Sequence, residues 1–150
     1  MRLAVLSCLV VLAACQSPQT LDTSTQLPTI PVRLPNGKVI RAEVARDVND
    51  QQRGLMFRTS LAPDHGMLFV FGAPGPRPFW MYHTLIPLDM LWLNQNRRIV
   101  FISANTPPCP SEKPEECPNY GGEAYAQYVL ELAGGVAAAQ GLKVGDTLQF

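Results

Sequence analysis

Proline and glycine divide the apolar residues of this chain into short runs. The 150 residues include 14 prolines and 11 glycines, a content that predicts many turns and few long helices. Once the two ends are set aside, the length suits one domain and is too short for two. We therefore expect a single small domain built mainly from strands.

Eight segments have the pattern of strands. Asn36-Gly37 between two alternating runs is a strong hairpin signal, and the continuous apolar run 67–71 is typical of a strand that is buried on both faces. The polar residues 94–97 join two further runs into a second hairpin. The expected strands cover residues 32–34, 39–45, 67–71, 79–82, 88–93, 98–103, 127–132 and 147–150.

Two short helices complete the expected fold. Asp47 and Asp50 offer N-caps for a helix that ends at about Arg53, and residues 136–140 predict an alanine-rich helix that Gly141 ends. Because most connections are short, we expect an α+β fold that is mostly antiparallel, in which about eight strands curl into a small barrel or sandwich.

The N-terminus has the pattern of an export signal. Arg2 precedes an apolar run, residues 3–14, which is too short to span a bilayer as a helix. The run leads into the sequence LAAC at residues 12–15, which resembles the lipobox of bacterial lipoproteins. In that family the signal is cut before the cysteine, and the thiol and the new amino terminus are acylated. Several acyl chains anchor a protein stably to a membrane.

These features predict three parts of the chain. Residues 1–14 form a lipoprotein signal peptide, residues 15–31 the lipidated Cys15 with a polar, proline-punctuated tether, and residues 32–150 the domain. An ordinary signal peptide that happens to contain a cysteine is the alternative. Because Gln16 follows the cysteine, rather than the aspartate that resembles an inner-membrane retention signal, we expect a lipid-anchored envelope protein on the periplasmic face of the outer membrane.

The balance of charge excludes one class of partner. Lysine and arginine together number 12, and so do aspartate and glutamate, so the formal net charge is zero. The chain has no basic run with interleaved aromatic residues, and no net field draws nucleic acid to it. We expect no nucleic-acid partner.

Two cysteines lie in a long proline-rich loop, residues 107–122. A loop this long in a small domain is usually functional, disordered or cross-linked. In an oxidising periplasm Cys109 and Cys117 predict a disulfide, which is worth about 2–3 kcal/mol. Zinc is the alternative, but the loop has no Cys-x-x-Cys pair and the chain has only two histidines. We expect the disulfide, and no metal or cofactor.

Several motifs of the domain occur together in one family. They are RGLMFR at 53–58, GMLFVF at 66–71, FWM at 79–81, Thr84, IPLD at 86–89, PPC at 107–109, CPNY at 117–120, YVLEL at 128–132 and GLKVGD at 141–146. In this order they resemble the bacterial and archaeal family DUF192, over roughly residues 32–150. The resemblance implies a compact, strand-rich α+β domain that is often exported, and it implies no reaction. His83 stands where the family pattern has asparagine.

Five residues of the central region are candidates for ligand binding. Arg53 and Arg58 can direct two guanidinium groups at a carboxylate or phosphate, or one of them can pair with Asp89 and hold the first helix to the sheet. Trp80 can stack on a flat ligand, or belong to the core. Thr84 adds a hydroxyl group. Asp89 can serve acid–base chemistry, or be a structural carboxylate.

Three functions fit these features. The leading hypothesis is a lipid-anchored periplasmic binding or accessory domain, whose shallow pocket at Arg53, Trp80 and Asp89 holds a small molecule or contacts an envelope protein. The second is a small hydrolase that uses Asp89 beside an arginine anion site. The third is a structural envelope protein in which the polar cluster is an internal brace. His65 and His83 occur without a serine motif, HExxH or cysteine dyad, and carry no catalytic prediction.

Overall fold

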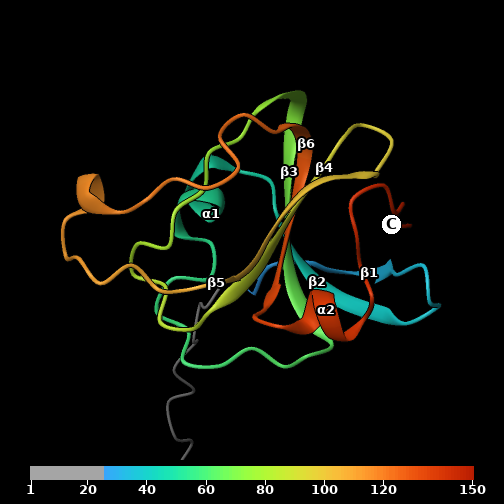
Figure 1. Ribbon diagram of the computed structural model, residues 1–150, viewed down its shortest axis with the longest axis horizontal. Helices are drawn as coiled ribbons and strands as arrows, with labels where there is room; N and C mark the ends of the chain where they lie inside the picture. Colours follow the sequence, from blue (N-terminus) through green and yellow to red (C-terminus); the bar gives the residue numbers. More distant parts are fainter. Residues whose placement is uncertain (1–25) are drawn as a thin grey trace, which may run out of the picture.

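The computed structural model describes residues 26–150, which form one mixed sheet with short helices (Figure 1). The expected signal peptide, Cys15 and most of the expected tether lie outside the described residues. The first strand, β1 (Thr29–Arg33), begins within the range predicted as tether, because residues 29–31 pair with the second strand. The first described strand therefore begins three residues before residue 32, the predicted start of the domain.

Six strands and three short helical segments make up the described part of the chain. They are β1 (Thr29–Arg33), β2 (Val39–Ala45), α1 (Val48–Arg53), β3 (His65–Pro76), β4 (Leu88–Leu93), β5 (Ile99–Thr106), the 3-10 helix η1 (Pro114–Glu116), β6 (Tyr125–Ala133) and α2 (Val136–Ala139). The sheet has the order β1-β2-β3-β6-β4-β5. Neighbouring strands are antiparallel, except that β2 and β3 are parallel and are joined by a crossover through α1.

The α+β class, the mostly antiparallel sheet and the two α-helices are confirmed, whereas the barrel and the count of eight strands are not. Residues 79–82 form no strand, because only Phe79 pairs, with Tyr120, and a left-handed backbone at His83 (φ 52°) turns the chain. The expected last strand is reduced to two single bridges, Thr147 with Arg98 and Gln149 with Arg33. The C-terminal residues contact both edges of the sheet only through these bridges and form no strand, so the sheet is not closed.

The two faces of the sheet carry two separate hydrophobic cores. Alternate residues of a strand point to opposite faces. The first core contains Leu68 and Leu130 with residues of α2 and the C-terminal segment. The second contains Met67, Leu55 from the segment after α1, and Met81. Figure 1 shows α1 and α2 on opposite sides of the central strands.

Asp89 holds α2 against the first face. Its side chain is fully buried. Oδ1 accepts a hydrogen bond from the backbone N–H of Asn105, and Oδ2 accepts one from the backbone N–H of Ala137, each at 2.6 Å. The residue before α2 is Gly135, which has no side chain to cap the helix. Asp89 therefore caps α2 from a neighbouring strand.

Gly121 lies against the buried ring of Trp92. A Cβ at Gly121 would lie 2.2 Å from two atoms of that ring, and the backbone φ is +64°. The ring is held in place, because its Nε1 donates to the carbonyl of Arg77 at 2.7 Å. Steric overlap and the left-handed backbone together are expected to make Gly121→Ala lower the free energy of unfolding by about 2–3 kcal/mol, measured by urea unfolding.

Gly37→Ala is the matched control for this prediction. Gly37 also has a positive φ, of +84°, but nothing lies within 4 Å of a Cβ there. The control should lose only about 1 kcal/mol, from the backbone conformation alone. Equal losses in the two variants would contradict the steric explanation.

Candidate functional site

A buried glutamate occupies the centre of the second face. Glu131 of β6 lies between Met67 of β3 and Met90 of β4, and the residue is only 4% exposed. Within residues 26–150 no hydrogen bond or ion pair engages its carboxyl group. Burial raises the pKa of this group to about 8, and the positive charge of Arg58 opposes the shift. The carboxyl group is therefore mostly protonated at neutral pH.

Arg58 is held by a second glutamate in the same row of the sheet. Glu43 of β2 is the neighbour of Met67 on the side away from Glu131. Arg58 donates from Nη1 and Nη2 to the two carboxylate oxygens of Glu43, at 2.6 and 2.7 Å. Such a two-fold contact fixes both side chains. The expected pairing of an arginine with Asp89 is therefore wrong.

A small cavity of about 90 Å³ opens from Glu131. Its wall includes the end of α1, the segment 78–80 and part of the second core. The lining residues that carry the argument are Arg53, Gly54, Phe79, Trp80, Thr84 and Glu131. Arg53, Trp80 and Thr84, three of the residues proposed from the sequence, thus share one cavity.

The local sequence explains how α1 positions Arg53. Asp47 caps the helix by accepting a hydrogen bond from the backbone N–H of Asp50, as expected from the sequence. Gln51 Nε2 donates to the carbonyl of Val70 at 2.9 Å, which ties α1 to β3. Gly54 then ends the helix with a φ of 47°. Arg53 is exposed and lies at the edge of the cavity.

Aromatic rings continue from the cavity over the surface, and we call them the aromatic rim: Trp80, Tyr82, His83 and Phe57. Successive ring centroids lie 5.7, 3.8 and 4.8 Å apart. Phe57 and His83 both have left-handed backbones, with φ of 64° and 52°. The N–H of Phe57 donates to the carbonyl of His83 at 2.9 Å. Strained non-glycine residues of this kind concentrate at functional sites.

The cross-linked loop supports the aromatic rim. Cys109 and Cys117 form the expected disulfide, with Cα atoms 5.6 Å apart. The N–H of Cys109 donates to the carbonyl of Met81 at 3.2 Å, and Tyr82 Oη donates to the carbonyl of Glu112 at 3.3 Å. The disulfide therefore stabilises a loop that packs directly against the rim.

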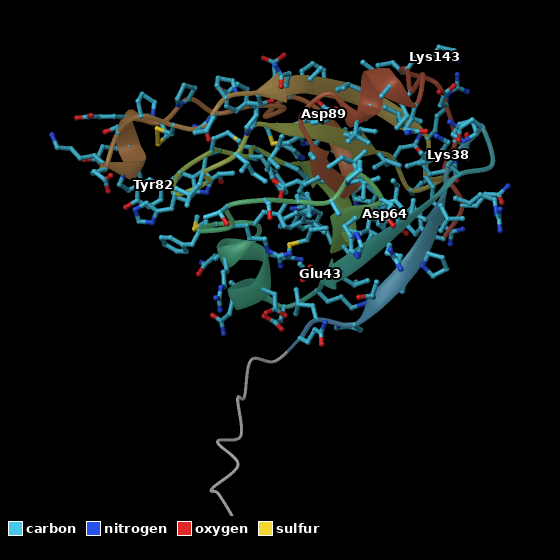
Figure 2. All side chains as sticks on the ribbon, turned by 90° about the horizontal axis from the view of Figure 1, so that it is seen from below. Lys38, Glu43, Asp64, Tyr82, Asp89 and Lys143 are labelled. Carbon is cyan, nitrogen blue, oxygen red and sulfur yellow. A yellow bond between two sulfur atoms is a disulfide. The ribbon has the colours of Figure 1, made fainter. Side chains whose placement is uncertain are left out.

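Asp89 is not part of this cavity, contrary to the pocket expected from the sequence. It lies on the first face, whereas Glu43 and Glu131 lie on the second. Figure 2 shows Asp89 towards the side of α2 and Glu43 towards the side of α1. His65 also lies apart, where its Nδ1 contacts Asp64 at 2.9 Å. The cavity that Arg53 and Trp80 line is therefore built around Glu131 and not around Asp89.

Sequence reasoning missed Glu131. It predicted the strand that contains this residue but did not single out its side chain as a candidate. The available signal was Val129, which shares the face of Glu131 and is fully buried. An apolar neighbour two positions away indicates that this face of the strand is covered too.

Two further findings limit the chemistry of the described residues. No group of three or more histidine, cysteine, aspartate or glutamate side chains among residues 26–150 is placed to hold a metal ion. In the same range no helix has the length and apolar character needed to cross a membrane.

The comparisons with known proteins establish the family. The sequence model of DUF192, described as an uncharacterized ACR, matches residues 32–150. The chain belongs to the DUF192 family. This family has no established function, and no curated protein matches the chain.

Two solved structures are similar to this DUF192 protein. A protein of unknown function from Novosphingobium aromaticivorans is 33% identical, with a TM-score of 0.75 over 96% of this chain and 100% of the other. A proposed transcription regulator from Sinorhizobium meliloti is 36% identical, with a TM-score of 0.72 over 83% of this chain and 95% of the other. Sequence and fold therefore agree on the family.

Proposed function

We propose that this protein is a lipid-anchored periplasmic domain that binds a small molecule in the cavity above Glu131. One observation carries the proposal: Glu131 is 4% exposed, its carboxyl group has no hydrogen-bond or ion-pair partner among residues 26–150, and it lines a cavity that Arg53 and Trp80 also line. Buried polar groups in proteins nearly always have hydrogen-bond partners. A bound molecule would supply the partner that Glu131 lacks within the described residues.

The surroundings of Glu131 suit such a molecule. Binding sites for small molecules combine apolar walls with a few polar groups that fix the orientation of the ligand. Here Phe79 and Trp80 provide the wall, and Arg53, Thr84 and Glu131 provide the polar groups. A cavity of about 90 Å³ suits one head group or small ring, and the half-exposed Trp80 offers a stacking surface beside it.

The anchoring part of the proposal rests on the sequence LAAC at residues 12–15 and on the polar segment that follows it. Gln26 and Leu27, the first described residues, line a second hollow together with Arg53 and Phe57. A chain anchored through Cys15 would thus enter the domain next to the candidate site. The outer membrane remains the proposed location, because Gln16 follows the cysteine.

The other functions have less support. Both carboxylate oxygens of Asp89 are engaged by backbone N–H groups, so a hydrolase built on Asp89 lacks a free catalytic group. Glu131 has the protonated state of a general acid, but Glu43, the next carboxyl group in the row beyond Met67, is committed to Arg58. The name of the Sinorhizobium protein suggests a role in transcription, for which a net charge of zero offers no support.

Thermal unfolding of the detergent-solubilised full-length protein tests the binding function. The panel is muropeptides, sugars, nucleotides and small carboxylates. A ligand at 100 times its dissociation constant should stabilise the fold by about 2.7 kcal/mol. Trp80→Ala should abolish this stabilisation and change the unfolding temperature of the free protein little, because the side chain is 41% exposed.

Phe101→Ala is the matched control, because Phe101 is an aromatic residue of similar exposure, 42%, that lies outside the cavity. This variant should keep the full ligand effect. The proposal fails if no compound stabilises the protein, or if Phe101→Ala abolishes the effect as completely as Trp80→Ala.

A further inference from the structure

We propose that the ligand is a small organic carboxylate, which accepts a hydrogen bond from the carboxyl group of Glu131 and pairs with the guanidinium group of Arg53. This inference rests on the proposed binding function and names the chemical class of its ligand. It follows from the charge of the cavity, the state of its acid and the shape of its wall.

Apart from Glu131, Arg53 is the only charged residue among residues 26–150 that lines the cavity. The neighbouring strands β3 and β4 present only Met67 and Met90 in the same row. Arg58, from the segment after α1, is neutralised by Glu43. Asp50 of α1 interacts electrostatically with Arg53 in the neighbouring hollow, which both residues line, but Asp50 does not line this cavity.

Arg53 therefore decides the charge preference of the cavity. It forms no ion pair shorter than 4 Å within residues 26–150. Opposite charges attract more strongly where water is partly excluded. An anion in the cavity gains the attraction of Arg53, whereas a cation is repelled by it.

The protonated state of Glu131 supplies the second half of the argument. A carboxyl group kept neutral by apolar surroundings can donate a hydrogen bond at neutral pH. Such a bond to a carboxylate oxygen is short and charge-assisted. The pKa of about 8 means that Glu131 retains its proton without a ligand. Ionised Glu131 would instead repel the anion.

Three compounds of one shape and different charge test the inference. Benzoate, benzamide and benzamidine carry an anionic, a neutral and a cationic head group on the same ring, which can stack on Trp80. Binding to the detergent-solubilised full-length protein is measured by titration calorimetry at pH 7. Benzoate should bind with a dissociation constant of about 1 mM, as expected for a ligand of this size. Benzamidine should bind at least about tenfold more weakly, because its charge meets that of Arg53.

The pH dependence of the affinity and the variant Glu131→Gln test whether the carboxyl proton of Glu131 takes part in binding, and Arg53→Gln tests the pairing with the guanidinium group. Above pH 8 the affinity for benzoate should fall about tenfold per pH unit, because the complex requires protonated Glu131. Glu131→Gln keeps a hydrogen-bond donor, so it should retain the affinity within about threefold and remove this pH dependence. Arg53→Gln should weaken benzoate binding about tenfold. Arg46→Gln, an exposed arginine outside the cavity, should leave the affinity unchanged.

A preference for the cation over the anion would overturn the inference about the ligand class but leave the proposed binding function standing. Three results together would identify a cation site. Benzamidine would bind more tightly than benzoate, its affinity would rise as the pH rises through 8, and Glu131→Gln would lower its affinity. Failure of all three compounds also overturns the carboxylate class. The binding function then still stands if another compound of the panel stabilises the protein in a manner that depends on Trp80.

Discussion

Replacement of Asp89 by alanine is expected to lower the free energy of unfolding by about 4 kcal/mol. The side chain is fully buried, and its two oxygens accept hydrogen bonds from the backbone of Asn105 and Ala137. Alanine leaves both N–H groups without a partner in a region closed to water. Each such group costs about 1–3 kcal/mol, so the loss for the two groups together is about 4 kcal/mol.

Urea unfolding of Asp89→Ala and of Asp47→Ala measures this effect against a matched control. Asp47 also caps a helix through its side chain, but it is exposed to solvent. Loss of an exposed cap costs about 1 kcal/mol. A brace role for Asp89 is contradicted if the two variants lose the same stability.

Because Asp89 and Glu131 lie on opposite faces of the sheet, their variants should affect stability and ligand binding separately. Asp89 lies on the face opposite to the cavity, so Asp89→Ala, at a temperature where it is still folded, should bind any ligand of the cavity with unchanged affinity. Glu131→Ala should show the reverse, with the affinity lost and the fold retained.

The second large effect is a dependence of stability on pH that comes from Glu131. The pKa of its carboxyl group is about 8 in the folded protein, and its ordinary value is 4.5. Between these values the folded state binds more protons than the unfolded state. The free energy of unfolding therefore falls as the pH rises from 4.5 towards 8, by at most about 1.4 kcal/mol per pH unit. Below pH 4.5 the contribution is fully present, and above about pH 8 it has been lost.

Glu131→Gln isolates this contribution from those of the other titrating groups. The difference in free energy of unfolding between this variant and the native protein should shift by about 4 kcal/mol from pH 4.5 to pH 9, in favour of the variant. Denaturant unfolding at intervals of one pH unit measures it. Glu115→Gln, which changes an exposed glutamate, should give a curve parallel to that of the native protein. A parallel curve for Glu131→Gln as well would rule out the raised pKa.

Local signals predicted the elements that depend on local interactions. The Asn36-Gly37 turn pairs β1 with β2, and Asp47 starts α1, because both act on backbone groups a few residues away. The Cys109–Cys117 disulfide has a sequence separation of only 8 and was predicted for the same reason. Each of these features depends on residues that lie close together in the sequence.

Features that depend on distant partners were missed. The partners of Asp89 are backbone N–H groups 16 and 48 positions away. Because every residue except proline has such a group, the sequence does not indicate which ones Asp89 contacts. Residues 79–82 have the alternation of a strand, but only Phe79 finds a partner. Glu131 becomes a buried acid only because β6 inserts between β3 and β4. The sheet order, which the sequence does not state, therefore decides the candidate site.

The single bridges made by the C-terminal residues cover one end of each edge of the sheet. The outer strands β1 and β5 each present unpaired backbone groups, which another chain can extend into a larger sheet. Thr147 and Gln149 occupy one end of both outer strands at once. Damage to this short segment would therefore uncover backbone groups at both edges of the sheet in one step, although the segment contributes no residue to the cavity.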